Sequence, residues 1–419
     1  MSEATTFWLT LCVFVSTYAG LVLGKLPGLR TDRTGIALIG ATLVLSLGLL
    51  SFGDAVKAID FGTIALLLGM MMVVVYLRRA GFFDVLAQKV LDGCREPRLL
   101  LGVVMLLSGV LSALLVNDVV CLALTPLVIR LTRHCRLDPR PHLIGLAVAS
   151  NIGSTATLTG NPQNMIIGGL SQIGYVRFAA KLAPVAVLGL AVAYAIALVV
   201  FRRALRAGSA GLAPDDDAGP RPLRPRQRRL LVKSLLVTAA TVILFFAGAP
   251  MPIVALGAAS VLLLDRVNPD GVYRLVHWSL LLMFAGLFVV VHAFEVHVLA
   301  KLDMAGWVAG QNEPIALLSG VSAVLSNIVS NVPAVLLFKP IIPHMEATFQ
   351  ETAWLALAMS STLAGNLTIL GSVANLIVVE NARREGVTIS LSDYCRLGVP
   401  VTLVTIVIGV VWLGFTGTD

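Results

Sequence analysis

Long, uninterrupted apolar runs constrain the fold of this chain more than any other feature. Val185–Phe201, Leu280–Val291 and Val399–Phe415 contain no charged residue. The whole chain is 57% hydrophobic and 13% charged, whereas soluble domains are about 45–50% apolar and about 25% charged. A run of about 20 apolar residues is long enough to cross a bilayer as a helix, and the strands of membrane barrels alternate in polarity instead. The sequence therefore predicts an all-α polytopic membrane protein and excludes soluble enzymes, disordered chains and fibres.

Ten apolar segments are predicted to span the membrane. The first, Thr6–Gly24, follows the start Met-Ser-Glu-Ala, which has no basic segment, so we expect it to be retained and not cleaved as a signal peptide. The predicted spans are 6–24, 35–51, 59–77, 142–172, 183–201, 231–248, 251–264, 279–299, 352–378 and 398–416.

Two further apolar stretches, 98–132 and 314–345, are interrupted near their middle by polar residues. Each forms either two full spans or one re-entrant hairpin, and the loop charges distinguish these alternatives because Lys and Arg concentrate in cytoplasmic loops. The 202–230 linker holds eight arginines and is assigned to the cytoplasm. With hairpins, only five of the 31 basic residues face outward: Lys57, Arg177, Lys181, Lys301 and Lys339. This asymmetry predicts two hairpins and both termini outside the cytoplasmic membrane.

The two halves of the chain repeat each other. Gly40-Ala41 recurs as Gly257-Ala258, and Leu-Ser-Gly-Val occurs at 107–110 and at 318–321. Five spans in each half place the two copies in opposite orientations, and inverted repeats with interrupted helices are typical of secondary transporters. The predicted units are repeat 1–201 with hairpin 98–132 and broken helix 142–172, the linker 202–230, and repeat 231–419 with hairpin 314–345 and broken helix 352–378.

Four polar segments lie where the chain should cross the membrane: Val116–Asp118, Ser150–Asn164, Ser326–Pro333 and Gly365–Asn375. Unpaired backbone at this depth costs several kcal/mol per group unless protein or a water-filled cavity surrounds it. Such breaks expose helix N-termini, which attract anions, and free carbonyls, which bind Na⁺. We therefore expect the four segments to form one central site.

Asp118 is the most informative single residue. A charge near the bilayer centre costs about 2.5–3.5 kcal/mol or more and usually has a function. Its repeat counterpart is Val332, so the carboxylate exists in one half only. A proton carrier and a cation ligand both explain it, and a carboxylate that caps the neighbouring helix is the structural alternative.

Other classes of site have no sequence signal. The five cysteines form no Cys-x-x-Cys pair, which argues against zinc and disulfide frameworks, and no phosphate-binding loop of the ATPase type occurs. The net charge of +8 fits basic cytoplasmic loops better than nucleic-acid binding. We expect no enzyme activity and no cofactor other than H⁺ or Na⁺ as the coupling ion.

Two motifs resemble those of a known superfamily. Asn117–Pro126 is similar to the hairpin motif of arsenite-pump relatives, and Ala149–Asn164 resembles the plant silicic-acid efflux transporters and related anion permeases. Both groups belong to the ion-transporter superfamily, together with dicarboxylate and citrate carriers and Na⁺/H⁺ antiporters. The carboxylate carriers have Ser-Asn-Thr at each hairpin tip, whereas the tips here are Val116-Asn117-Asp118 and Ser330-Asn331-Val332. They also have Thr-Pro-Pro-Asn in the second broken helix, where this chain has Ser372–Asn375. Both departures disfavour a carboxylate substrate.

The resemblance implies an elevator-type carrier that forms a homodimer. It implies cation or proton coupling at Asn117, Asp118, Gly160, Asn331 and Gly371. It implies substrate binding at Asn117, Thr157, Asn161, Asn164, Ser330, Asn331, Thr368, Ser372 and Asn375.

The leading hypothesis is a proton- or Na⁺-coupled transporter of a small oxyacid or oxyanion, with efflux of arsenite or silicic acid as the favoured version. Two alternatives remain: a cation-coupled carrier of an organic anion such as a carboxylate, and a Na⁺/H⁺ antiporter. The basic linker is also a possible docking surface for a separate ATPase subunit, although cytoplasmic topology alone explains its charge.

Overall fold

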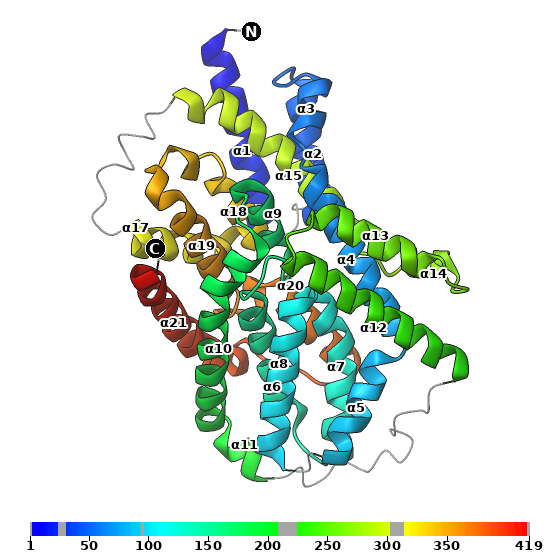
Figure 1. The fold of residues 1–419 in the computed structure, drawn as a ribbon. Coiled ribbons are helices and arrows are strands. Elements are labelled where there is room, and N and C mark those ends of the chain that lie inside the picture. The colour runs from blue at the N-terminus through cyan, green and yellow to red at the C-terminus, as the bar shows by residue number, and fades with distance from the viewer. Residues whose placement is uncertain (1, 24–30, 94–95, 208–223, 302–313, 417–419) are drawn as a thin grey trace.

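Helices make up all the regular structure of the described residues in this computed structural model (Figure 1). The structure describes residues 2–23, 31–93, 96–207, 224–301 and 314–416. The α-helices are α1 Glu3–Leu23, α2 Arg33–Ser46, α3 Phe52–Ala58, α4 Phe61–Arg79, α5 Phe82–Gly93, α6 Pro97–Leu114, α7 Asn117–His134, α8 Pro139–Ser154, α9 Pro162–Ser171, α10 Tyr175–Val200, α11 Arg202–Ala207, α12 Pro225–Phe246, α13 Met251–Leu263, α14 Pro269–Tyr273, α15 Trp278–His297, α17 Pro314–Val329, α18 Asn331–Phe338, α19 Ala347–Ala364, α20 Val373–Arg384 and α21 Leu391–Thr416. Three short 3-10 turns are η1 Leu299–Lys301, η2 Ile342–His344 and η3 Ile369–Gly371.

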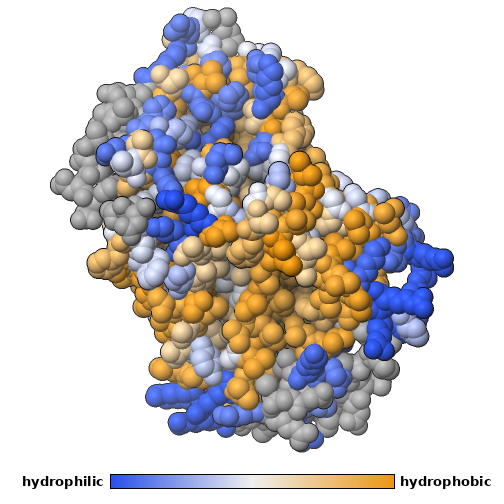
Figure 2. All heavy atoms as spheres, in the orientation of Figure 1, coloured by the Kyte–Doolittle hydropathy of each residue, from blue (hydrophilic) through white to orange (hydrophobic). Residues whose placement is uncertain are grey.

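Seven of the described helices are long and apolar enough to cross a membrane: α1, α4, α6, α10, α12, α15 and α21. Six of them coincide with predicted spans, and α6 is the first arm of the predicted hairpin 98–132. The predicted spans 35–51 and 251–264 correspond to the shorter helices α2 and α13, of 14 and 13 residues. A broad apolar band crosses the molecule between hydrophilic ends (Figure 2). The protein is therefore a multi-pass, all-helical membrane protein.

Some short helices are not predicted by the apolar runs of the sequence. Four short helices contain charged residues and therefore form no long apolar run that would predict them: α3, α5, α11 and α14. Both ends of the predicted linker 202–230 are helical, because α11 begins at Arg202 and α12 begins at Pro225. A proline in the first turn of α12 fits there because that position needs no amide donor. Linker residues 208–223 lie outside the described residues.

Each predicted hairpin consists of two helices. α6 and α7 are joined by Leu115 and Val116, and α17 and α18 are joined by Ser330. The first arms pack along the broken helices, α6 against α8 and α17 against α19. Hydroxyl pairs secure these contacts: Ser112 Oγ lies 2.8 Å from Ser150 Oγ, and Ser322 Oγ contacts Ser360 Oγ.

Both predicted broken helices are interrupted in the structure. The first ends at Ser154 and resumes as α9 at Pro162, and the second ends at Ala364 and resumes as α20 at Val373. Side-chain caps start the second pieces: Asn161 Oδ1 accepts from the Asn164 amide at 2.8 Å, and Ser372 Oγ accepts from the Ala374 amide. Caps of this kind satisfy amides that would otherwise be unpaired at a helix start.

The hydrogen bonds around the breaks repeat between the halves. Asn164 Nδ2 donates to the carbonyls of Ser154 and Thr157 at 3.1 and 3.0 Å. In the second half, Asn375 Nδ2 donates to the carbonyls of Gly365 and Thr368 at 2.7 and 3.0 Å. Each partner lies 211 residues further along the chain. The internal repeat read from the sequence thus has a matching hydrogen-bond pattern, while the inverted membrane orientation stays a prediction.

The repeat also recurs where helices from opposite halves touch. α4 packs against α13, and α15 packs against α2. A Cβ added to Gly69 of α4 would lie 2.5 Å from the Ala255 carbonyl carbon, and one added to Gly286 of α15 would lie 2.8 Å from the Ala37 oxygen. Only glycine permits this backbone approach, which explains why both positions carry it.

Candidate functional site

The hairpin tips meet the breaks of the interrupted helices, as predicted. The Asn117 amide donates to the Gly160 carbonyl at 2.9 Å. In the amide orientation that satisfies both of its side-chain atoms, Asn331 donates to the Gly371 carbonyl at 3.1 Å. The structure therefore forms one pair at each tip, Asn117 with Gly160 through a backbone amide and Asn331 with Gly371 through a side-chain amide.

A buried amide network links the two halves between these pairs. Asn151 Nδ2 donates to Asn366 Oδ1 at 2.9 Å and to Asn375 Oδ1 at 3.0 Å. Ser372 Oγ and Asn117 Nδ2 donate to Asn151 Oδ1 at 3.0 and 3.2 Å. Asn151 is thus saturated, and it ties the first hairpin to the second broken helix.

The other half makes the reciprocal contact. Asn161 Nδ2 and Gln163 Nε2 each donate to Thr362 Oγ1 at 3.2 Å. Thr362 and Ser372 lie 211 residues after Asn151 and Asn161, so the two contacts are equivalent under the repeat. Sequence reasoning missed Asn151, Gln163, Thr362 and Asn366 as site residues, although all except Thr362 lie in polar segments that it had singled out.

Several predicted substrate residues hold the breaks together in this structure. Both side-chain N–H groups of Asn164 and of Asn375 are used on backbone carbonyls. The Thr157 hydroxyl donates to the Ala113 carbonyl, and the Thr368 hydroxyl donates to Asn327 Oδ1 at 3.4 Å. These contacts give the four residues a positioning role here.

A small cavity lies beside this network. It has a volume of about 150 Å³, and both hairpin tips reach it through Asp118 and Ser330. Four polar residues from α2 and from the start of α15 also line it, and sequence reasoning missed all four: Arg33, Thr34, His277 and Ser279. Apolar residues complete the wall: Leu21, Leu280, Met283, Val329, Pro333 and Val373. Thr157, Asn161, Asn164, Thr368 and Asn375 are not among the lining residues.

Asp118 brings a buried carboxylate to this cavity. Its side chain is 7% exposed, and no hydrogen bond or ion pair joins its carboxylate to another described residue. The cap residue of α7 is Val116, which makes no side-chain capping bond, so Asp118 does not have the helix-capping role considered as the structural alternative. A buried carboxylate without a fixed partner is costly, and a proton or a cation would relieve that cost.

Ser330 has an unusual backbone at the other tip. Its φ is 79° and its ψ is 159°, a region that is essentially restricted to glycine and costs about 1–3 kcal/mol for other residues. Strain of this kind persists only where the surroundings enforce it, and it clusters at functional sites. Ser330 thus stands out in the structure independently of the sequence motif that predicted it.

The half-buried Arg33 brings a positive charge to the same cavity. Its guanidinium makes no ion pair within the described part of the chain. From the sequence, the groups expected to attract an anion were the helix N-termini exposed at the breaks. The structure adds a guanidinium, because α2 carries its first residue to the hairpin tips.

Comparisons with known proteins agree with this architecture. The sequence pattern of the family described as citrate transporter matches residues 18–364. The silicon efflux transporter LSI3 of Oryza sativa subsp. japonica is 30% identical, with 94% of each chain covered. The 46 kDa membrane protein of Mycobacterium leprae is 30% identical, with 97% of each chain covered. The putative transporter arsB of Dictyostelium discoideum is 26% identical and covers 95% of this chain and 89% of its own.

A solved structure has the same fold. The crystal structure of the Alcanivorax borkumensis YdaH transporter superposes with a TM-score of 0.63 at 15% identity, and it covers 99% of this chain and 98% of its own. The family pattern spans most of the chain, and the relatives match it over nearly their whole length. The chain therefore belongs to the citrate transporter family, within the ion-transporter superfamily, and is a membrane transporter and not an enzyme.

Proposed function

We propose that this protein is a secondary active transporter, coupled to H⁺ or Na⁺, that moves a small oxyacid or oxyanion of the arsenite or silicic acid type, with efflux favoured. The observation that carries the proposal is the shared cavity of Asp118, Ser330 and Arg33. It combines an unpaired carboxylate that can take up a cation with hydroxyl and guanidinium groups that can bind oxygen atoms.

The size of the cavity supports a small substrate. Pockets for drug-sized ligands have volumes of about 300–1,000 Å³, and this one has about 150 Å³. A metalloid hydroxide has only a few heavy atoms, whereas a tricarboxylate needs more room. The name of the rice relative, a silicon efflux transporter, points to the same substrate class.

Coupling is assigned to the two hairpin tips. Asp118 carries the proton or contributes to a Na⁺ site with the backbone around Asn117 and Gly160, and Asn331 with Gly371 forms the equivalent site in the second half. The amide network through Asn151 and the bonds of Asn331 support elevator movement, because together they tie both hairpins and both broken helices into one unit.

The proposal also covers the oligomeric state of the protein, its membrane and its topology. We place it as a homodimer in the cytoplasmic membrane, with the 202–230 linker inside and both termini outside. The N-terminus and α11, which leads into the linker, lie at opposite ends of the molecule (Figure 1). A separate ATPase subunit on the basic linker remains a secondary possibility to test by co-purification.

Flux measurements in proteoliposomes test the proposal. We expect uptake of arsenite or silicic acid that follows an imposed proton or Na⁺ gradient, and we expect Asp118→Asn to lose gradient-driven accumulation. Asp84→Asn is the matched control, because Asp84 is half-exposed and pairs with Arg130 away from the cavity. Flux that ignores both gradients would refute the coupling.

The same vesicles distinguish the alternatives. The family description favours an organic anion, and gradient-driven citrate or succinate uptake without metalloid transport would establish that function instead. Na⁺-dependent proton release from vesicles that contain no other solute would establish a Na⁺/H⁺ antiporter.

A further inference from the structure

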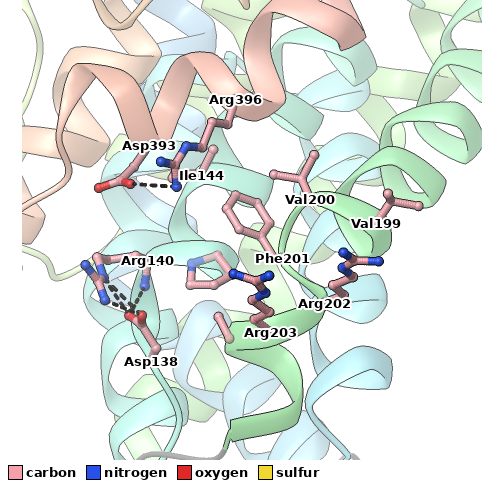
Figure 3. A pocket seen from close by; sticks show the side chains of 12 residues that line it. Asp138, Arg140, Ile144, Val199, Val200, Phe201, Arg202, Arg203, Asp393 and Arg396 are labelled. Carbon is pink, nitrogen blue, oxygen red and sulfur yellow. Dashed lines mark hydrogen bonds and ion pairs between the residues drawn. The ribbon is translucent and has the colours of Figure 1, made fainter.

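A second cavity lies at the junction of α10 and α11. It has a volume of about 640 Å³ and is bordered by the start of α8, the end of α10, α11 and the start of α21 (Figure 3). Charged side chains from α11 and from the starts of α8 and α21 line it: Asp138, Arg140, Arg202, Arg203, Asp393 and Arg396.

The cavity has an excess of positive charge. Arg140 is paired with Asp138, with Nη2 2.7 Å from Oδ2, and Arg396 lies 3.8 Å from Asp393. Arg202 and Arg203 make no ion pair within the described part of the chain, and Figure 3 draws no bond to either. Two guanidinium groups are therefore available to an anion.

The walls next to these arginines are apolar and exposed. Val199 lines the cavity and is 68% exposed, and Leu188, eleven residues earlier, lies on the same face of α10 because eleven residues make about three helical turns. On α21, Leu403 is 59% exposed and lies about two turns beyond Arg396 on the same face. Both helices thus carry an apolar stripe that leads away from the cationic cavity into the membrane.

We propose that this cavity binds the phosphate headgroup of an anionic phospholipid, with the acyl chains lying along α10 and α21. Guanidinium groups pair with phosphate oxygens in a bidentate manner, and basic pockets between membrane helices on the cytoplasmic side bind anionic headgroups. A soluble anion would use the arginines but not the apolar stripes. This site is separate from the cavity at the hairpin tips, so lipid binding there is independent of which solute is transported.

Lipid binding to the full-length, delipidated protein tests the proposal. Native mass spectrometry would follow titration with phosphatidylglycerol, with phosphatidylcholine and with inorganic phosphate. Each arginine near a membrane surface is worth about fivefold in affinity, so Arg202→Gln/Arg203→Gln should weaken phosphatidylglycerol binding about 30-fold. Arg206→Gln is the matched control, because Arg206 lies on α11, is exposed and does not line the cavity.

A second variant tests the apolar wall. Val199→Asp places a negative charge where the phosphate and the upper acyl chain would lie, so it should weaken binding at least as much as the double arginine variant. The lipid site would be overturned if phosphatidylcholine bound as tightly as phosphatidylglycerol, or if inorganic phosphate at the same concentration blocked phosphatidylglycerol binding. An equal loss of binding in Arg206→Gln would also overturn it. Unchanged binding in both cavity variants would overturn it as well.

Discussion

At the scale of single residues, opposite charges from distant parts of the chain line the cavity at the hairpin tips. Asp118 comes from the first hairpin tip, and Arg33 comes from the start of α2. Neither is joined to another described residue by an ion pair, so both remain available to solute and coupling ion. A cation bound at Asp118 would leave Arg33 as the net attractor for an oxyanion. The proposed division of roles would link coupling to substrate binding.

Substitution of Arg33 tests that division. Hydrogen bonds to a charged group are worth about 1.5–3 kcal/mol, so Arg33→Gln should raise the KM for transport about tenfold or more with a smaller effect on the maximal rate. Arg33→Lys should recover part of the affinity, because it keeps the charge but not the two-pronged geometry. Arg274→Gln, an exposed arginine, is the control. A wild-type KM in Arg33→Gln would remove Arg33 from the site.

The two charges differ in how far the sequence predicts them. Asp118 stands out because an apolar stretch surrounds it, and its depth follows from the spans on either side. Arg33 and His277 precede apolar runs, where basic and polar residues are common, so nothing local marks them. They gain a role only because the folded chain brings the starts of α2 and α15 to the cavity at the hairpin tips.

At the scale of helices, the breaks are held by two equivalent asparagines. The apolar runs and the Gly- and Asn-rich segments predict where the helices stop, to within a few residues. They do not predict that Asn164 and Asn375 bond to carbonyls at the ends of α8 and α19, because that contact depends on how the chain folds back. From the sequence, Asn164 and Asn375 were instead expected to bind substrate.

Alanine substitution separates these roles. Asn164→Ala removes one of the two hydrogen bonds that the Ser154 and Thr157 carbonyls each accept, because Asn161 Nδ2 and the Gly160 amide still donate to them. Asn375→Ala leaves the Gly365 carbonyl without a donor among the described residues, and a buried unpaired group costs about 1–3 kcal/mol. Both should lower the midpoint of thermal unfolding in detergent. Asn375→Ala should lower it more, because Asn375 Oδ1 also accepts from Asn151, whereas Asn164 Oδ1 is unpaired among the described residues. The half-exposed Asn381→Ala is the control. Full stability of Asn164→Ala, with altered transport, would restore the substrate role.

At the scale of the whole molecule, the contacts divide into two kinds. Buried amide hydrogen bonds join both hairpins to the broken helices, and these elements together are called the hairpin unit. Contacts from α1 and α15 to the second hairpin are fewer: Tyr18 Oη donates to the Pro333 carbonyl at 3.1 Å, and Lys339 pairs with Glu295 at 3.3 Å. If the hairpin unit moves against α1 and α15, these are the bonds that must break while the amide network stays intact.

Reversible cross-links test this movement. In a variant without native cysteines, Glu295→Cys/Lys339→Cys joined by a short bifunctional thiol reagent should stop transport, and reduction should restore it. Ser112→Cys/Ser150→Cys is the matched control, because these hydroxyls lie 2.8 Å apart within the proposed moving unit, so a disulfide there should leave transport intact. Continued transport with the first pair linked would reject elevator movement of the second hairpin. A block with the control pair alone would place the moving boundary inside the hairpin unit, between α6 and α8.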